Sequence, residues 1–281
     1  MTDTTSRNRY PIASELARSW LLVSARTLSG GGDPPAGAAD EIVLDIEDAI
    51  DPSLKADARG DVVRWLADGA AWVRINDHNS PFWEADVQAL RGARGLRGVM
   101  LAKAESGRAV SETSHALGRA TPVMALVESA LGIEESVDIA RADGVFRLAF
   151  GSGDYRRDTG ASADDLAMAY PRSRLVVASR IGGLPGPVDG PTVSTSHTLL
   201  REQSAVGVSL GMTGKLCLQN EQTSVVNESF SPSLSDVSWA RDFLADFESR
   251  GGVVRDGSDP PRLGRARRIQ ELATAFGMAA L

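Results

Sequence analysis

Two acidic residues lie where a pair of parallel strands would end. Glu128 closes the apolar run PVMALVE, and Asp154 closes the run VFRLAFGSGD. Between them, residues 132–142 carry apolar side chains roughly on one helical face, which predicts a helix. A strand–helix–strand unit of this kind brings the carboxyl ends of both strands to one edge of a sheet. Two carboxylates meeting there would suit a hard divalent cation such as Mg²⁺, which takes oxygen ligands.

Charged residues also end several other short apolar runs. EIVLDIEDAI bears Asp45, Glu47 and Asp48, AWVRIN bears Arg74, and GVMLAKAES bears Lys103 and Glu105. Charges aimed at one rim must pair or bind a ligand, because burying them unpaired is costly. Arg74 offers a planar, two-pronged donor for a substrate carboxylate or thioester oxygen. With a divalent cation, such a set suits reversible carbon–carbon cleavage beside a carbonyl, where negative charge develops on oxygen.

The elements that would carry these residues are eight short apolar runs separated by helical stretches. The runs begin at SWLLVSA and end near residues 215–218. This alternation is typical of either an open doubly wound sheet or a closed (β/α)₈ barrel. Eight units within about 250 residues, with charged residues at many strand ends rather than at one switch point, favour the α/β class and a (β/α)₈ TIM barrel.

The chain divides into three predicted segments. Residues 1–18 form a flexible amino-terminal arm, residues 19–230 form the barrel, and residues 231–281 form a carboxy-terminal helical extension. The extension places Val237, Ala240 and Phe243 on one helical face and continues into a second amphipathic helix, GRARRIQELATAFGMAAL. We expect this extension to pack on a neighbouring subunit, and therefore a homo-oligomer.

Composition narrows the function classes. The 281 residues are 42% hydrophobic, which is ample for a large core, and the formal net charge of −7 argues against nucleic acid as the main partner. One cysteine, Cys217, excludes an intramolecular disulfide framework. No secretory signal and no apolar run of about 18 residues is present, so we predict a cytoplasmic protein without a membrane span. The three histidines do not lie at strand ends, which disfavours a zinc hydrolase.

An ordered set of motifs resembles a known family. The pieces are SWLLVSA, VLDIEDAI with KADAR, WVRIN, VMLAKAES, MALVESALGI, LAFGSGD with DTGA, PRSRLVVASR, PVDGP, GMTGK and SPSLSDVSWAR. Their order over roughly residues 19–275 resembles the citrate lyase β-subunit-like (CitE-like) branch of the HpcH/HpaI aldolase and CoA-ester lyase superfamily. The resemblance implies a Mg²⁺-dependent barrel, trimeric or a multiple of that, acting on CoA thioesters of hydroxy-dicarboxylic or tricarboxylic acids.

The resemblance also implies roles for individual residues. Glu128 and Asp154 would be the metal ligands, and Arg74 would hold substrate near the metal. Glu47 and Asp48 would support the water shell of the metal and the arginine. Substrate-binding positions would be Arg74, Lys103, Glu105, Gly151 and Ser152. Asp259 would reach into a neighbouring subunit's site as a proton donor or acceptor.

The chain departs from the family pattern in four places. Ser24–Ala25–Arg26–Thr27 replaces a proline–glycine after the first strand, GGGDPPAG replaces most of the first helix, Leu218–Gln222 replaces IHP-x-Q, and the tail loop around Asp259 is shorter. The last three lie where the resemblance implies contact with CoA. Our first hypothesis is a Mg²⁺-dependent carbon–carbon lyase that cleaves or forms a 3-hydroxyacyl-CoA thioester such as a citryl-, malyl- or citramalyl-CoA analogue. The alternatives are a Mg²⁺-dependent aldolase for free 2-oxo acids without CoA, and an inactive oligomeric partner or regulatory protein.

Overall fold

The structure, a computed structural model, describes residues 11–278 of the chain. These residues form two compact units. One contains residues 17–229, and the other contains residues 11–16 and 230–278. The first ten residues of the predicted arm 1–18 lie outside the described residues.

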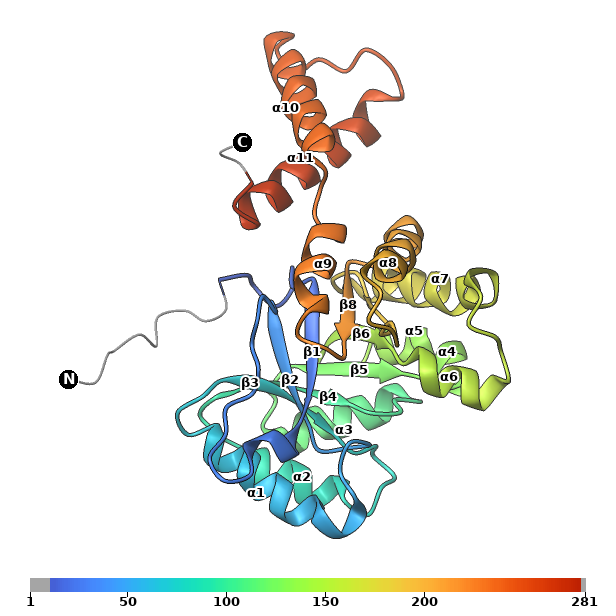
Figure 1. Ribbon diagram of the computed structural model, residues 1–281. Coiled ribbons are helices and arrows are strands. Elements are labelled where there is room, and N and C mark those ends of the chain that lie inside the picture. Colours follow the sequence, from blue (N-terminus) through green and yellow to red (C-terminus); the bar gives the residue numbers. More distant parts are fainter. Residues whose placement is uncertain (1–10, 279–281) are drawn as a thin grey trace, which may run out of the picture. The chain divides into compact units, whose positions relative to one another are not determined.

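The larger unit is a closed barrel of eight parallel strands in sequence order (Figure 1). The strands are β1 (Ser19–Ser24), β2 (Glu41–Asp45), β3 (Ala71–Ile75), β4 (Leu96–Leu101), β5 (Val123–Val127), β6 (Val145–Phe150), β7 (Val188–Asp189) and β8 (Gly214–Cys217). Trp20 of β1 pairs with Leu216 of β8, which closes the ring. The prediction of a (β/α)₈ TIM barrel is therefore confirmed.

Helices surround this barrel. They are α1 (Lys55–Trp65), α2 (Trp83–Leu90), α3 (Gly107–Leu117), α4 (Ala130–Glu134), α5 (Ser136–Ala140), α6 (Ser152–Thr159), α7 (Asp165–Gly182), α8 (His197–Leu210) and α9 (Gln222–Ser229), with 3₁₀ turns η1 (Ala25–Leu28) and η2 (Pro52–Leu54). The helix predicted over residues 132–142 is two short helices, because Glu135 leaves the helical conformation between them. Only η1 lies between β1 and β2, so GGGDPPAG forms an irregular connection, as its glycines and prolines predict.

The barrel interior is filled with side chains and closed at its amino-terminal end. Trp20 and Trp72 meet edge to face, with ring centroids 5.2 Å apart. Arg147 is fully buried beside them and donates to the carbonyl oxygens of Gly186 (2.7 Å) and Ala17 (2.9 Å), just before β7 and β1. The barrel is therefore a packed core, and the carboxyl ends of the strands are left to form a site.

A buried ionic cluster joins the barrel to its helical layer. Asp189 of β7 is inaccessible to solvent; its carboxylate accepts from Arg172 Nε of α7 at 2.8 Å and from Lys215 Nζ of β8 at 2.9 Å. Burial by itself raises the pKa of Asp189, but the cations of Lys215 and Arg172 outweigh it, so the pKa lies below its usual value. The carboxylate is therefore needed in its charged form to neutralise two buried cations.

Replacing Asp189 by asparagine should destabilise the barrel by about 3–5 kcal/mol, because it leaves Arg172 and Lys215 buried without a counter-charge. Chemical denaturation monitored by circular dichroism measures this change. Because the folded pKa of Asp189 is depressed, its contribution is present above about pH 3.9, the unfolded value, and is lost as pH falls through the folded value. The variant should lack this acid-sensitive part; equal acid sensitivity in both proteins would contradict the assignment.

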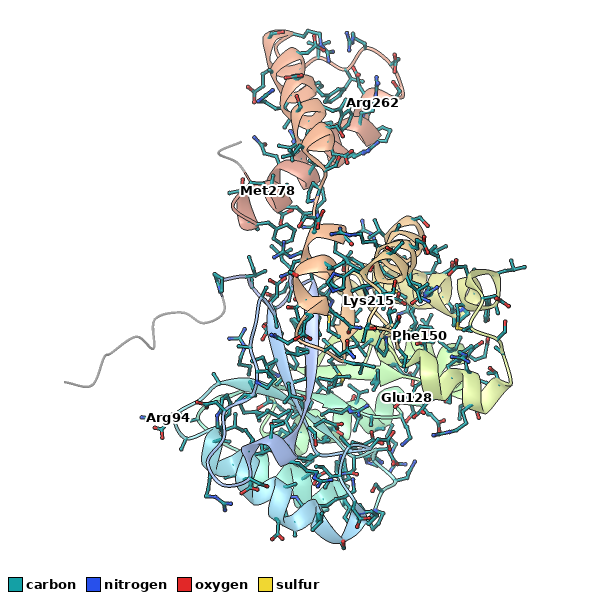
Figure 2. All side chains as sticks on the ribbon, viewed as in Figure 1. Arg94, Glu128, Phe150, Lys215, Arg262 and Met278 are labelled. Atoms are coloured by element: carbon teal, nitrogen blue, oxygen red, sulfur yellow. The ribbon has the colours of Figure 1, made fainter. Side chains whose placement is uncertain are left out.

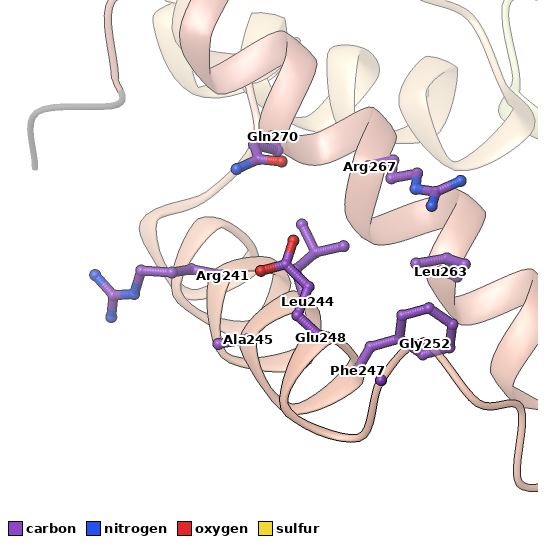
Figure 3. Close-up of a pocket in the computed structure, with 10 residues that line it drawn as sticks. Arg241, Leu244, Ala245, Phe247, Glu248, Gly252, Leu263, Arg267 and Gln270 are labelled. Atoms are coloured by element: carbon purple, nitrogen blue, oxygen red, sulfur yellow. The ribbon is translucent and has the colours of Figure 1, made fainter.

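The smaller unit is a helical hairpin. It contains α10 (Leu234–Ser249) and α11 (Asp259–Ala275), whose apolar faces meet at Ala240, Phe243, Ala266 and Ile269. A groove of about 530 Å³ runs between the two helices (Figure 3). No helix of the described chain is both long and apolar enough to cross a membrane.

Candidate active site

Glu128 follows β5 and provides a buried carboxylate at the carboxyl end of the barrel (Figure 2). It is 5% exposed, and its Oε1 accepts the backbone N–H of Lys103 at 2.9 Å. Burial raises the pKa of Glu128 to about 8, and the nearby Asp154 adds to this, although the Lys103 N–H and Arg74 act in the opposite direction. A buried carboxylate of this kind gains from a bound cation.

Lys103 connects Glu128 to the second strand. Its backbone has a φ of 48°, a left-handed conformation that non-glycine residues seldom adopt, and this turn aims its N–H at Glu128. The side chain of Lys103 contacts the acids that follow β2: its Nζ donates to Glu47 Oε1 at 2.6 Å and lies 3.6 Å from Asp48. Burial raises the pKa of Glu47, whereas its ion-pair partners Arg74 and Lys103 lower it in part. The structure thus brings together predicted residues from β2, β4 and β5.

Arg74 is fixed by a bidentate ion pair with Asp45. Its Nε and Nη2 donate to the two carboxylate oxygens at 2.8 and 2.6 Å, and Nη1 lies 3.5 Å from Glu47. A guanidinium has five N–H groups, so this pair leaves donors on Nη1 and Nη2 for a ligand. The motifs assign no role to Asp45, although its position two residues after Val43, whose side chain lies in the barrel interior, indicates that it points into the barrel mouth.

A second polar network holds the loop that carries Glu47. Lys55 Nζ donates to the carbonyl oxygens of Ile46 and Glu47 and to Asn76 Oδ1, at 2.7–3.1 Å. Asn76 in turn donates to Asp86 through its backbone N–H and its side chain. Motif reasoning did not assign these residues to the site. They act by fixing the loop, because their polar atoms are used within the protein.

Asp154 lies in the first turn of α6, and its side chain is 21% exposed, with Arg157 Nη1 3.2 Å away. Its negative charge contributes to the raised pKa of Glu128. Among residues 11–278, no cluster of three or more His, Cys, Asp or Glu side chains is arranged to hold a metal ion. Two carboxylates nevertheless fit Mg²⁺, which usually keeps several water or substrate oxygens as ligands.

The other predicted binding residues have distinct surroundings. Glu105 accepts from the hydroxyl of Ser129 at 2.5 Å, and that hydroxyl also caps α4 through the Gly132 N–H. The Glu105 carboxylate is therefore hydrogen-bonded to Ser129, the residue that caps α4. Ser152 begins α6, and Gly151 packs directly against Glu128. Substrate binding by these residues stays a prediction.

The absence of a side chain at Gly151 makes room for Glu128. A methyl group at this position would overlap the Oε2 and Cβ atoms of Glu128, whereas at Gly153 it would meet nothing within 4 Å. Gly151→Ala should therefore lower both Mg²⁺ affinity and turnover by at least about tenfold, since it displaces a carboxylate positioned for its ligand. Calorimetric titration with Mg²⁺ and an activity assay measure this. Gly153→Ala is the control, and equal losses in both variants would contradict the explanation.

Asp259 lies in the hairpin unit at the start of α11 and is 1% exposed. Its carboxylate accepts the backbone N–H of Arg255 at 2.9 Å and a guanidinium N–H of Arg250 at 3.3 Å. These contacts, led by the backbone hydrogen bond, lower its pKa. A role for Asp259 in a neighbouring copy's site stays a prediction, and it would require the carboxylate to leave these partners.

Known proteins share this architecture. Residues 31–220 match the model of the HpcH/HpaI aldolase/citrate lyase family, and residues 235–277 match that of the HpcH/HpaI aldolase C-terminal domain. The mitochondrial citramalyl-CoA lyase of Homo sapiens is 31% identical over 277 residues, covering 86% of this chain and 81% of the relative. A citrate lyase subunit beta-like protein of Deinococcus radiodurans is 28% identical, covering 84% of this chain and 89% of the relative.

A solved structure extends the comparison. CitE of Mycobacterium tuberculosis, in complex with magnesium, acetoacetate and coenzyme A, has a TM-score of 0.76 and 26% sequence identity, and the match covers 92% of this chain and 99% of CitE. The family match spans most of the barrel, including Glu128, Arg74 and Lys103. The chain therefore belongs to the HpcH/HpaI aldolase/citrate lyase family and is a lyase of the CoA-ester lyase type.

Proposed function

We propose that this protein is a Mg²⁺-dependent carbon–carbon lyase that cleaves or forms a 3-hydroxyacyl-CoA thioester such as a citryl-, malyl- or citramalyl-CoA analogue. The observation that carries the proposal is the buried carboxylate of Glu128, which accepts the backbone N–H of Lys103 on a rim that also carries the fixed guanidinium of Arg74. Relatives named as citramalyl-CoA lyase and L-malyl-CoA/beta-methylmalyl-CoA lyase support the substrate class.

Glu128 and Asp154 would hold the Mg²⁺, with water and substrate oxygens as its other ligands. This choice of metal is supported by the magnesium in the CitE complexes. When bound, the metal supplies a fixed positive charge that polarises a substrate oxygen.

Cleavage requires one proton to leave the 3-hydroxyl group and another to arrive at C2. As the hydroxyl proton leaves, the C2–C3 bond breaks; its electron pair forms the thioester enolate, and the other fragment leaves as a carbonyl compound. Arg74, held by Asp45, directs its remaining N–H groups toward the negative oxygen of the substrate. Glu47 and Asp48 are the carboxylates of this rim that we assign to proton movement, directly or through water. Protonation of C2 gives the shorter acyl-CoA.

Lys103 keeps these charges in place. Its ammonium donates to Glu47 and its backbone N–H donates to Glu128, so this one residue positions both carboxylates. Neighbouring acids raise its pKa despite partial burial, and it therefore stays protonated in neutral solution. A fixed set of charges of this kind needs no rearrangement when the enolate forms.

The test is turnover of purified protein with citramalyl-CoA, malyl-CoA and citryl-CoA, with acyl-CoA release followed by chromatography. We expect product with Mg²⁺ and at least about a hundredfold loss with a chelator, since the metal is assigned the developing charge. Parallel reactions with pyruvate and oxaloacetate address the aldolase alternative. Turnover of free 2-oxo acids alone would overturn the thioester proposal.

The aldolase alternative has one specific observation in its favour. The connection after β1 contains only the turn η1 where the family resemblance implies a longer helix near CoA. At the end of β8, Gln222 binds the N–H groups of Leu218 and Gln219 and the carbonyl oxygens of Thr192 and Ser194. These contacts tie the turn after β8 to the segment after β7.

A further inference from the structure

Arg157 of α6 is an exposed cation next to a proposed metal ligand. Its Nη1 lies 3.2 Å from Asp154 Oδ1, and its side chain is 71% exposed, whereas the side chain of Asp154 is 21% exposed. The two residues are three positions apart, so their side chains lie on neighbouring parts of one helical face. An exposed ion pair of this kind contributes little to stability. Another cation that binds Asp154 can therefore take the place of the arginine.

A contact with the start of α4 fixes the orientation of α6 at the carboxyl end of the barrel (Figure 1). Asp158 accepts the backbone N–H of Ala130, two residues after Glu128, at 2.8 Å. At about 100° per residue, Asp158 and Arg157 lie on opposite sides of Asp154, about 40° and 60° away from it. Arg157 therefore flanks the proposed metal ligand on the side that faces away from α4.

The other cations assigned to this rim are already held by carboxylates. Arg74 is fixed by a bidentate ion pair, and Lys103 Nζ donates to Glu47. Their side chains are 13% and 33% exposed, compared with 71% for Arg157. When a divalent cation neutralises Asp154, Arg157 loses its counter-charge and can bind another anion with its N–H groups. Metal binding at Asp154 thus makes an anion-binding group available beside the metal.

The three thioesters named under the proposed function differ in one substituent on C3. In each of them C3 bears a hydroxyl group, a carboxylate and the CH₂ group of the thioester arm. The fourth substituent is hydrogen in malyl-CoA, a methyl group in citramalyl-CoA and a carboxymethyl group in citryl-CoA. The shared hydroxyl and carboxylate oxygens suit a divalent cation. The second carboxylate of the citryl group needs a further cation near the first, and a guanidinium matches a carboxylate with two parallel hydrogen bonds.

We infer that Arg157 selects the citryl-type substrate, the one with a carboxymethyl group on C3. The inference rests on the proposed function, because that function assigns Asp154 to the metal. In the metal-free protein Arg157 neutralises Asp154. In the metal-bound protein its guanidinium binds the second carboxylate of the substrate. The metal and a citryl-type ligand therefore strengthen each other's binding, since coupling between two binding sites is reciprocal.

The first measurement is the affinity for Mg²⁺, by calorimetric titration without any organic acid. Arg157→Gln should bind Mg²⁺ about two- to fivefold more tightly than wild type, because the metal no longer has to displace a cation from Asp154. Arg156→Gln is the matched control, since it removes the same charge from an exposed residue of α6 that points about 160° away from Asp154. It should change the affinity less than about twofold. Equal gains in both variants would contradict displacement of Arg157 by the metal.

The second measurement is the binding of citrate and citramalate with excess Mg²⁺ in both the cell and the syringe. Citrate carries a carboxymethyl group where citramalate carries a methyl group, so wild type should bind citrate more tightly. Arg157→Gln should bind citrate about tenfold more weakly than wild type, the cost of a charge-assisted hydrogen bond, and should bind citramalate within about twofold of wild type. The ratio of kcat/KM for citryl-CoA to that for citramalyl-CoA should fall by about the same factor. Arg156→Gln should keep the wild-type ratio.

The outcomes separate this inference from the proposed function. Melting temperatures show whether each variant is folded, which is expected for substitutions at exposed positions. Equal losses of citrate and citramalate binding in Arg157→Gln, or no preference for citrate in wild type, would overturn the role of Arg157 while Mg²⁺-dependent turnover remained. A wild type that does not bind Mg²⁺ would overturn both, because Asp154 would then not be a metal ligand.

Discussion

Glu128→Gln should abolish the response of the protein to Mg²⁺ and lower turnover by at least about a thousandfold, because it removes the charge of the proposed metal ligand from a nearly dry site. Wild type should melt at a higher temperature when Mg²⁺ is added, since a ligand that binds only the folded state stabilises it. The variant should show no such shift. Thermal melts with and without Mg²⁺, together with the acyl-CoA assay, measure both effects.

The same variant should also show that the Glu128 carboxylate lowers the stability of the metal-free protein. Burial raises the pKa of Glu128 to about 8, so ionising it in the metal-free protein is unfavourable, whereas glutamine carries no charge. Metal-free Glu128→Gln should therefore melt no lower than metal-free wild type. Glu135→Gln, at an exposed acid between α4 and α5, is the control and should keep the Mg²⁺ shift. An undiminished shift in Glu128→Gln would remove Glu128 from the metal site.

Arg74→Lys should lower kcat/KM by about a hundredfold to a thousandfold, the usual cost of losing a donor to developing oxyanion charge. A lysine keeps the positive charge but cannot form the bidentate pair with Asp45 or present further N–H groups in a fixed plane. Steady-state kinetics with the best substrate measure the loss. If the ground state and the transition state depend on Arg74 equally, the loss appears in KM; if only the transition state does, it appears in kcat.

The chain contains a control for this substitution. Arg97 holds Glu41 in a similar bidentate pair, at 2.9 and 2.6 Å, but near the amino-terminal ends of β4 and β2. Arg97→Lys therefore removes an ion pair of the same geometry far from the strand ends that form the site. It should lower stability without changing kcat/KM more than about threefold. Equal kinetic losses in the two variants would show that Arg74 acts through stability alone.

Sequence patterns were sufficient for the barrel and for the carboxylates at its rim. Glu128 closes an apolar run, and a run of that type in a parallel barrel ends at the functional face. The strand positions followed from apolar runs, except that β7 consists of only Val188 and Asp189 because the chain leaves the sheet at Gly190. The division of the predicted helix at Glu135 depends on a single backbone conformation, which residue periodicity does not encode.

Other parts of the site could not be predicted because they depend on atoms that residue types do not reveal. The hydrogen bond to Glu128 comes from a backbone N–H, and its direction depends on the left-handed turn at Lys103. The support of Glu47 by Lys55 and Asn76 joins segments twenty or so residues apart through tertiary contacts. Asp189 illustrates the same limit, since a lone aspartate near a strand does not show that two cations are buried around it.

Lys103 contacts Glu128 through its backbone and Glu47 through its side chain, and these two contacts depend on the residue type in different ways. Every residue except proline supplies a backbone N–H, so the hydrogen bond to Glu128 can persist through substitution at this position, provided that the turn is kept. The ammonium that meets Glu47 depends on lysine itself. Mutation at this one position can therefore alter the charge that faces Glu47 while the Glu128 carboxylate keeps its hydrogen bond.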